Sequence, residues 1–280
     1  MKKVLLSVLA HPDDESFGMG GTLAKYAEDG VDVHLICATR GEAGEVESEY
    51  LTGFSSIADL RVSELNCAVQ HLGITSLTML NYRDSGMTGS DDNQNPKALI
   101  NAPLEQVARE ITEKIRQLKP QVVLTFDPLG GYRHPDHIFV HNAAKKAFEM
   151  AGDPAYKSDL PPHKPGKLFF HTFPKRFIRF NIRLLKFVGR DPSKYGRNQD
   201  IDLTKIAVDF PVHTKVSYRS VQEQKDSAAA CHASQGGEGL TRSAMRIFAW
   251  LMGAKSEDLF MQAVPEPDNK KMSKDLFDGL

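Results

Sequence analysis

Short runs rich in apolar and β-branched residues alternate with amphipathic stretches along the first 150 residues. Such runs at residues 4–10, 31–38, 77–82 and 122–126 are bounded by turn residues, which predicts buried strands. Between and after them, apolar residues recur at helical spacing, which predicts helices over residues 20–29, 59–72, 104–118 and 136–150. Strands that alternate with helices favour a parallel sheet. We therefore expect an α/β protein with a Rossmann-like three-layer fold and a mostly parallel central sheet.

After residue 150, the alternation of predicted strands and helices becomes less regular. Residues 153–166 are rich in proline and lysine and are typical of a connection. Strands are predicted at residues 168–173 and 207–212, and helices at residues 220–232 and 243–252. Residues 265–280 are polar and contain two prolines, which predicts a loosely held tail. We expect a single catalytic α/β domain over residues 1–265, with a basic insertion at 153–205, followed by a polar tail at 266–280.

The charges of the chain nearly balance. Its 280 residues include 35 lysines and arginines and 36 aspartates and glutamates, a formal charge of −1. A protein that binds nucleic acid through bulk charge needs a clear excess of lysine and arginine, so no nucleic-acid partner is expected. Hydrophobic residues make up 41% of the chain, which argues against a mostly disordered protein.

One segment departs from this balance. Residues 164–197 carry ten lysines and arginines against Asp191 alone, a net charge of +9. Five of the basic residues recur every three or four positions among large apolar residues: Arg176, Arg179, Arg183, Lys186 and Arg190. A helix here would carry a basic stripe on an apolar body, and a packed helix with a solvated basic face is the simplest interpretation. Of the other two hypotheses, we favour a lid or homo-oligomer contact over a membrane-surface helix, and expect membrane contact, if any, only through residues 176–190.

Cysteine usage and the N-terminus favour a cytoplasmic protein. Cys37, Cys67 and Cys231 are odd in number, lie far apart and form no CxxC pair, which indicates neither a disulfide scaffold nor a thiolate zinc site. A reducing compartment is the simplest expectation. Residues 1–10 imitate a short signal peptide, but HPDDE follows instead of a small-residue cleavage site. No apolar run approaches the roughly 18 to 20 residues that span a bilayer.

Two similar motifs follow the first and fourth predicted strands: HPDD at residues 11–14 and HPDH at residues 134–137. In an open parallel sheet, the carboxyl ends of the strands carry the ligand-binding loops. Imidazole and carboxylate side chains favour Zn²⁺ or a similar divalent metal, and three protein ligands leave a position for water. Because a bound water with a pKa near ~7 is a hydrolytic nucleophile, the two motifs predict a hydrolytic metal site.

Each motif taken alone has a simpler interpretation, because an aspartate before a helix caps it. Capping gives no reason for histidines at both strand ends, so the pair of motifs favours a metal site. His141 lies one turn beyond His137 and could compete as a ligand. Five histidines without comparable neighbours are treated as structural or surface residues: His34, His71, His163, His171 and His213.

Further motifs accompany these two. They are AHPDDESFGMGGTLAKYAEDG at residues 10–30, TRGEAGE at 39–45, Arg61 and Glu64 on one predicted helix, YRDSGM at 82–87 and GGYRHPDH at 130–137. With them the chain resembles the LmbE/PIG-L family of zinc-dependent N-acetylglucosamine deacetylases, strongly over residues 4–150 and weakly at KDSAAACHASQ, residues 225–235. YRDSGM and the tyrosine before HPDH resemble the branch that acts on glucosaminyl-inositol thiol precursors and conjugates.

The resemblance implies a role for each matching residue. The ligands of one Zn²⁺, or of another divalent metal, would be His11, Asp14 and His137. Asp13 would be the base that deprotonates the metal-bound water. A protonated His134 would stabilise the oxyanion and could protonate the leaving amine, with help from Tyr132. The substrate would be held by Arg61, Asp84 and Met87, and Asp136 would orient a ligand histidine. Amide hydrolysis needs such an activated water, a base, an electrophilic group and a proton for the amine.

We therefore expect a hydrolase that removes the N-acetyl group from an N-acetylglucosamine-type amino sugar or glycoside. Its expected partner is this small-molecule substrate, and a homo-oligomer is in keeping with the basic segment. An amidase that cleaves a larger acyl group, such as a thiol conjugate, is the alternative enzyme, and a sugar-binding or regulatory module is the alternative without catalysis. A dinucleotide site at Gly18, Gly20 and Gly21 is disfavoured because their spacing is not GxGxxG.

Overall fold

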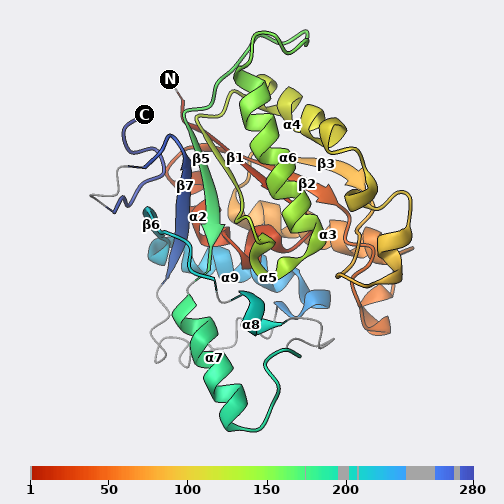
Figure 1. The fold of residues 1–280 in the computed structure, drawn as a ribbon. Helices are drawn as coiled ribbons and strands as arrows, with labels where there is room; N and C mark the ends of the chain where they lie inside the picture. Colours follow the sequence, from red (N-terminus) through yellow and green to blue (C-terminus); the bar gives the residue numbers. More distant parts are fainter. Residues whose placement is uncertain (1, 174, 195–201, 207, 238–255, 268–271) are drawn as a thin grey trace.

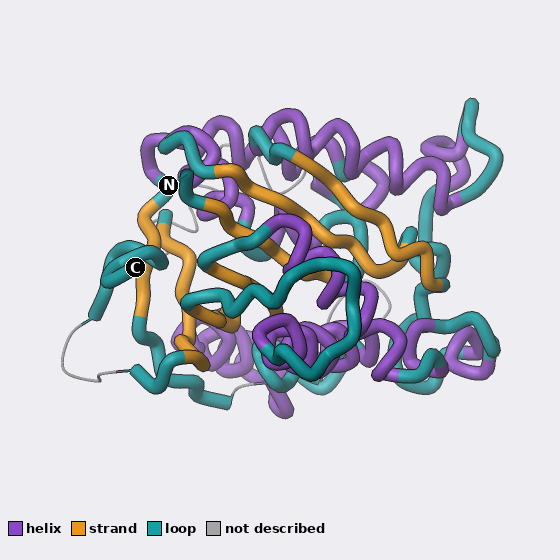
Figure 2. Tube along the Cα trace, turned by 90° about the horizontal axis from the view of Figure 1, so that it is seen from above, coloured by secondary structure: helices purple, strands orange, loops and turns teal. Residues whose placement is uncertain are grey.

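A central sheet lies between two layers of helices (Figures 1 and 2). The structure is a computed structural model, and it describes all residues except 1, 174, 195–201, 207, 238–255 and 268–271. Among the described residues, no helix is both long enough and apolar enough to cross a membrane.

Five parallel strands form the body of the sheet, whose order is β3-β2-β1-β4-β5-β7-β6. The parallel strands are β1 (Val4–Leu9), β2 (Asp32–Thr39), β3 (Ser76–Tyr82), β4 (Val122–Phe126) and β5 (Lys167–Thr172). β7 (Glu257–Val264) pairs antiparallel with both β5 and the edge strand β6 (Thr214–Ser217). Because helices cover both faces, β4 and β5 are buried throughout, which explains the nearly continuous apolar sequence of β4.

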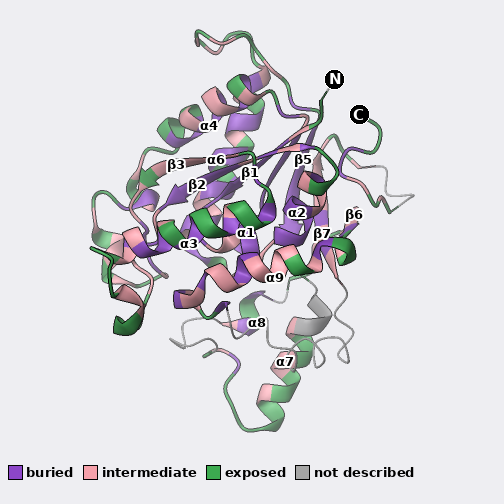
Figure 3. Ribbon diagram, turned by 180° about the vertical axis from the view of Figure 1, so that it is seen from behind, coloured by how far each residue is buried: buried purple, intermediate pink, exposed green. Residues whose placement is uncertain are grey.

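The helices segregate to the two faces of the sheet. α4 (Leu104–Leu118) packs on α6 (Pro135–Gly152), which covers β1 and β4 in the front of Figure 1. The opposite face, seen in Figure 3, carries α1 (Asp14–Phe17), α2 (Gly20–Glu28), α3 (Ile57–Leu72) and α9 (Gln222–Cys231). Local signals set the ends of α3, because the Ser56 hydroxyl accepts from Asp59 N–H and Gly73 adopts φ 68°. The predicted three-layer α/β fold is confirmed.

Part of the basic insertion predicted at residues 153–205 projects from this body, whereas β5, which falls within the same range, is a strand of the central sheet. Within the insertion lie α7 (Lys175–Phe187) and the short α8 (Leu203–Ile206), and Figure 1 shows α7 extending away from the sheet. A short α5 (Gly130–Arg133) lies beside α8, where Arg133 Nε donates to the Lys205 carbonyl. The helix predicted from the basic stripe is therefore present.

In the second half of the chain, one predicted strand was wrong and one strand was missed. The described residues 208–212 form no strand; the edge strand is β6, a few residues later. β7 was missed, because only alternate residues at its start are buried and three of its eight residues are polar. The helix predicted over residues 243–252 lies outside the described residues.

The described C-terminal residues are held more firmly than their polar sequence predicts. Leu276 and Phe277 are buried. The Tyr26 hydroxyl on α2 donates to Asp275 Oδ1 and accepts from Leu276 N–H. Since these partners lie some 250 residues away in the sequence, a local pattern could not reveal them.

Cys67 and Cys231 form a disulfide, contrary to the expectation from the sequence. Cys67 lies on α3 and Cys231 ends α9, and their Cα atoms are 5.8 Å apart. Their separation of 164 residues carries no pairing signal, and only the packing of α3 on α9 brings them together. Cys37 is free and buried. The cysteine argument for a reducing compartment therefore fails.

Candidate active site

The two histidine motifs meet at the point where the strand order reverses. β1 lies between β2, which follows it in the chain, and β4, which begins the other half of the sheet. Loops that leave the carboxyl ends of two such strands diverge and leave a crevice between them. The HPDD loop follows β1 and the HPDH loop follows β4, so both motifs face this crevice.

Three donor atoms converge there from His11, Asp14 and His137. His11 Nδ1 lies 3.1 Å from His137 Nε2 and 3.5 Å from Asp14 Oδ2, and His137 Nε2 lies 3.2 Å from Asp14 Oδ1. All three side chains are almost wholly removed from solvent. Tetrahedral zinc with bonds of about 2.0–2.2 Å places its ligand atoms roughly 3.4 Å apart. The three donors therefore fit one such ion.

The second ring nitrogen of His11 and that of His137 each face a hydrogen-bond acceptor, which agrees with metal binding through the first. His11 Nε2 lies 3.1 Å from Asp136 Oδ2, and His137 Nδ1 lies 3.2 Å from the Gly130 carbonyl. Each acceptor favours a proton on the nitrogen it faces and leaves the other nitrogen unprotonated for a metal. Asp136, which is fully buried, also accepts from both the backbone N–H and the hydroxyl of Ser85. It thus lies where an orienting residue was predicted.

Asp13 lies beside the donors on a strained backbone. Its φ of 122° is rare for a residue with a side chain and costs on the order of 1–3 kcal/mol. Arg61 Nη2 donates to Asp13 Oδ2 at 3.0 Å and to the Pro12 carbonyl, and Nη1 donates to the Gly41 carbonyl. Burial raises the pKa of Asp13 to about 6 despite the opposing charge of Arg61. Arg61 therefore holds the predicted base in this structure, where the resemblance had implied contacts with sugar.

His134 is the N-cap of α6. Its Nδ1 accepts from Asp136 N–H at 3.2 Å, so its ring proton is on Nε2. Burial, and then the neighbouring His11 and His137, hold the pKa of His134 well below its usual range. The ring is therefore neutral at pH 7 in this structure, whereas the resemblance implied a protonated one. A neutral ring still donates a hydrogen bond through Nε2–H.

A cavity of about 630 Å³ opens over these groups. Of the predicted site residues, it is lined by His11, Asp13, Arg61, Asp84, Met87, Tyr132 and His134. Asp84 Oδ1 accepts from Gly86 N–H and lies 3.5 Å from His11 Nε2. Burial raises the pKa of Tyr132, so its hydroxyl keeps its proton. The loops after β1, β2, β3 and β4 all contribute to this wall.

His141 lies outside the donor cluster. Its Nδ1 donates to the Phe126 carbonyl at 2.8 Å, and its ring packs against Phe170. The structure therefore gives it no place as a competing ligand.

Several residues around the site were not predicted. The short 3₁₀ helix η5 (Ala233–Gln235) brings Ser234 and Gln235 to the cavity wall, and His232 pairs with Glu15 behind it. The weak similarity at KDSAAACHASQ covers these residues, but it assigned none of them a role. No local spacing connects His232 with Glu15, which lies 217 residues earlier.

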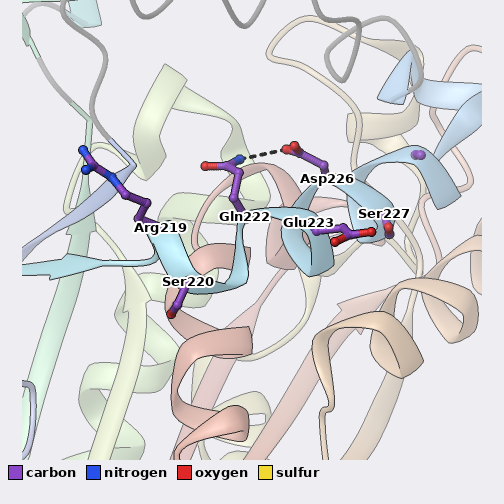
Figure 4. A pocket seen from close by; sticks show the side chains of 7 residues that line it. Arg219, Ser220, Gln222, Glu223, Asp226 and Ser227 are labelled. Carbon is purple, nitrogen blue, oxygen red and sulfur yellow. Dashed lines mark hydrogen bonds between the residues drawn. The ribbon is translucent and has the colours of Figure 1, made fainter.

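Two other features lack the chemistry of this cavity. A hollow of about 640 Å³ lies along α9, where Gln222 and Asp226 hydrogen-bond to each other (Figure 4). None of its lining residues belongs to the metal-ligating groups found among the described residues. His71 lies near Cys67 and Cys231, but the two sulfur atoms are bonded to each other.

Comparison with known proteins relates the chain to enzymes that remove acetyl groups. The profile of the PIG-L family, described as GlcNAc-PI de-N-acetylase, matches residues 6–148. A relative from Geodermatophilus obscurus, described as 1D-myo-inositol 2-acetamido-2-deoxy-alpha-D-glucopyranoside deacetylase, is 38% identical over 242 residues, which are 82% of each chain. A protein of the same description from Streptomyces griseus is 42% identical over 82% of this chain and 74% of its own.

Solved structures share the fold at lower identity. The N,N'-diacetylchitobiose deacetylase of Pyrococcus horikoshii is 22% identical, with a TM-score of 0.62 over 93% of this chain and 84% of its own. The 4-carboxy-2-hydroxymuconate hydratase of Pseudomonas putida is 21% identical, with a TM-score of 0.63 over 96% of this chain and 99% of its own. Because one fold carries both a deacetylase and a hydratase, the fold alone does not decide the reaction.

Proposed function

The chain belongs to the PIG-L family, and from this premise we propose that it hydrolyses the N-acetyl group of N-acetylglucosamine joined to an inositol. The reaction releases acetate and a free amine. The observation that carries the proposal is the convergence of His11, Asp14 and His137 on one point beside Asp13. The inositol part rests on relatives that are 38% and 42% identical to this chain over the aligned 242 and 241 residues.

The proposed cofactor is one Zn²⁺, held by His11 Nδ1, His137 Nε2 and an oxygen of Asp14. A divalent metal at this place would lower the pKa of a water molecule and polarise the acyl oxygen of the substrate. Burial alone would raise the pKa of Asp14, but His137 and His11 hold it well below its usual range. Asp14 therefore stays ionised, as a ligand must.

Asp13 is the proposed base. Arg61 fixes its Oδ2, so the proton of the attacking water would pass to Oδ1 as the water oxygen bonds to the acyl carbon. The same proton would then pass from Asp13 to the nitrogen of the amide as the C–N bond breaks. This route supplies the proton for the leaving amine without a charged His134.

His134 and Tyr132 are the proposed partners of the developing oxyanion. Both line the cavity, and both carry a donor: Nε2–H on His134 and the hydroxyl on Tyr132. A donor already aimed at the place where negative charge develops stabilises the transition state more than the substrate. Asp136 would support the site indirectly by holding the His11 ring.

The substrate would be bound by the loops around the cavity. Asp84 is ionised, because His11 and the Gly86 N–H hold its pKa below its usual range despite its burial. It is the proposed acceptor for a sugar hydroxyl, and Met87 would contact the sugar or its aglycone. Arg61 would reach the substrate only at the edge of the cavity, since three of its hydrogen bonds go to protein atoms.

We further propose that α7 is an oligomer contact or lid. The role of α7 rests on its exposed apolar side chains, of which Phe187 is the most exposed.

A panel of substrates tests the proposed reaction. The zinc-loaded protein should release a primary amine from an inositol glycoside of N-acetylglucosamine, with a higher kcat/KM than from N-acetylglucosamine alone. A thiol conjugate with a larger acyl group is the comparison substrate. Preferred cleavage of that conjugate would replace the proposal by the amidase. Binding of all three compounds without turnover would replace it by a sugar-binding module.

A further inference from the structure

The backbone of Asp13 is held from behind by a buried carboxylate. Asp13 N–H donates to Glu15 Oε2 at 3.0 Å, within a turn where Asp13 itself adopts a positive φ. Glu15 is 1% exposed, and its other oxygen, Oε1, accepts from the Ser16 hydroxyl at 2.6 Å. One oxygen of Glu15 thus faces the proposed base, and the other faces away from it.

His232 completes this arrangement. Its Nε2 lies 2.7 Å from Glu15 Oε1, and the ring is fully buried against Phe17. Burial would lower the pKa of His232, but the carboxylate of Glu15 raises it overall, so Nε2 carries a proton that Glu15 accepts. Among the described residues, His232 Nδ1 has no hydrogen-bond partner. Within the described part of the chain, the His232 ring therefore makes its hydrogen bond to Glu15 alone.

Two further contacts fix the segment that carries His232. The disulfide of Cys231 with Cys67 joins the residue immediately before it to α3. Two residues after it, the backbone N–H and hydroxyl of Ser234 donate to the two oxygens of Glu64, also on α3, at 2.8 and 2.7 Å. Figure 3 shows α1, α3 and α9 side by side on this face of the sheet. The same helix supplies Arg61, which holds the Asp13 side chain.

We propose that His232 is a positioning residue that acts through Glu15 to hold the strained backbone of Asp13. Arg61 fixes the carboxylate from the cavity side, and the His232–Glu15 pair fixes the peptide group from the core side. His232 does not line the cavity, and its Nε2 contacts Glu15 instead of a donor of the metal. This inference rests on the proposed function only in giving Asp13 its role as the base.

Two substitutions at His232 test the inference. One removes the hydrogen-bond donor to Glu15, and the other keeps a donor near the position of Nε2. His232→Leu removes the donor to Glu15, whereas His232→Gln places an amide N–H near the former Nε2. We expect His232→Leu to lower kcat at least tenfold, with KM and zinc affinity changed less than threefold. His232→Gln should recover most of the loss. Glu15→Leu should lower kcat by a similar factor, and the double variant Glu15→Leu/His232→Leu should be no worse than Glu15→Leu alone.

Hydrogen exchange at the Asp13 amide, followed by NMR, provides a readout that needs no turnover. We expect His232→Leu to speed this exchange and His232→Gln to leave it near the wild-type rate. The matched control is His163→Leu, because His163 bonds the Pro120 carbonyl at the opposite end of the sheet. It should change neither the exchange nor kcat.

The outcomes separate this inference from the proposed function. A folded His232→Leu protein with wild-type kcat and unchanged Asp13 exchange would overturn the inference. Loss of zinc in that variant would also overturn it, since the pair would then serve the ligands. A wild-type protein inactive on every substrate would refute the proposed function, while faster Asp13 exchange in His232→Leu would still support the positioning role.

Discussion

Asp13 and Asp14 are neighbours in the chain, yet their surroundings shift their pKa values in opposite directions. Burial raises the pKa of Asp13 to about 6, although Arg61 opposes this shift. Asp14 is also buried, but His137 and His11 hold its pKa well below the usual range. A carboxylate that stays ionised suits a metal ligand, and one that titrates near neutrality suits proton transfer. Environment, more than residue type, therefore separates the two proposed roles.

Alanine substitutions at these positions should give different phenotypes. Asp13→Ala should keep its metal and lose turnover by about 10²–10⁴-fold, the usual contribution of a general base. Asp14→Ala and His11→Ala should lose the metal itself, because each removes one of three converging donors. Metal content after desalting, together with kcat at saturating zinc, checks both expectations. Full deacetylase activity in metal-loaded Asp13→Ala would contradict the assignment of the base.

The pH dependence of kcat/KM should report the ionisation of Asp13. A base must be unprotonated to act, so kcat/KM should fall as the pH drops below about 6. Arg61 stabilises the Asp13 carboxylate, so Arg61→Gln should raise the pKa of Asp13 and move the acidic limb to higher pH. Arg61→Lys keeps the positive charge and is the matched control. An acidic limb at the same pH in Arg61→Gln and wild type would argue against this coupling.

Among the helices and strands around the site, the sequence predicted those that a local pattern of residues identifies. β1 and β4 are short apolar runs, each followed by histidine, proline and aspartate, so both their burial and their chemistry can be read locally. α9 and η5 are different. Their place against α3 depends on Cys231, Ser234 and His232 meeting partners more than 160 residues away. A single sequence does not show which distant residues pair, so the contact of His232 with Glu15 behind Asp13 was not predicted.

The disulfide between α3 and α9 should stabilise the fold. Cross-linking two residues 164 positions apart restricts the unfolded chain, and native disulfides typically contribute about 2–4 kcal/mol. We expect reduction with a dithiol to lower the free energy of unfolding by that amount in urea denaturation. Cys67→Ser should start at the lower stability and show no further response to the reductant. An equal midpoint for oxidised and reduced wild type would show that the bond adds no stability.

For the molecule as a whole, the formal charge of −1 is the sum of a basic segment and an acidic remainder. Residues 164–197 carry +9, so the rest of the chain carries −10. Sequence alone revealed this charge pattern and the helical stripe, and the structure adds that α7 projects from the body. Because Phe187 is 88% exposed and Val188, which follows the helix, is 57% exposed, the end of α7 carries exposed apolar area next to basic side chains.

An acidic body and a projecting basic helix are complementary surfaces, and two copies could each place α7 against the body of the other. We expect light scattering to give about twice the 31.1 kDa mass of one chain. Leu184→Glu with Phe187→Glu should return the mass to that of one chain, because both exposed apolar side chains would become acidic. Phe54→Glu is the matched control, since Phe54 is an exposed aromatic residue outside α7. A single-chain mass for wild type, with sedimentation on anionic liposomes at physiological salt, would instead assign α7 to a membrane surface.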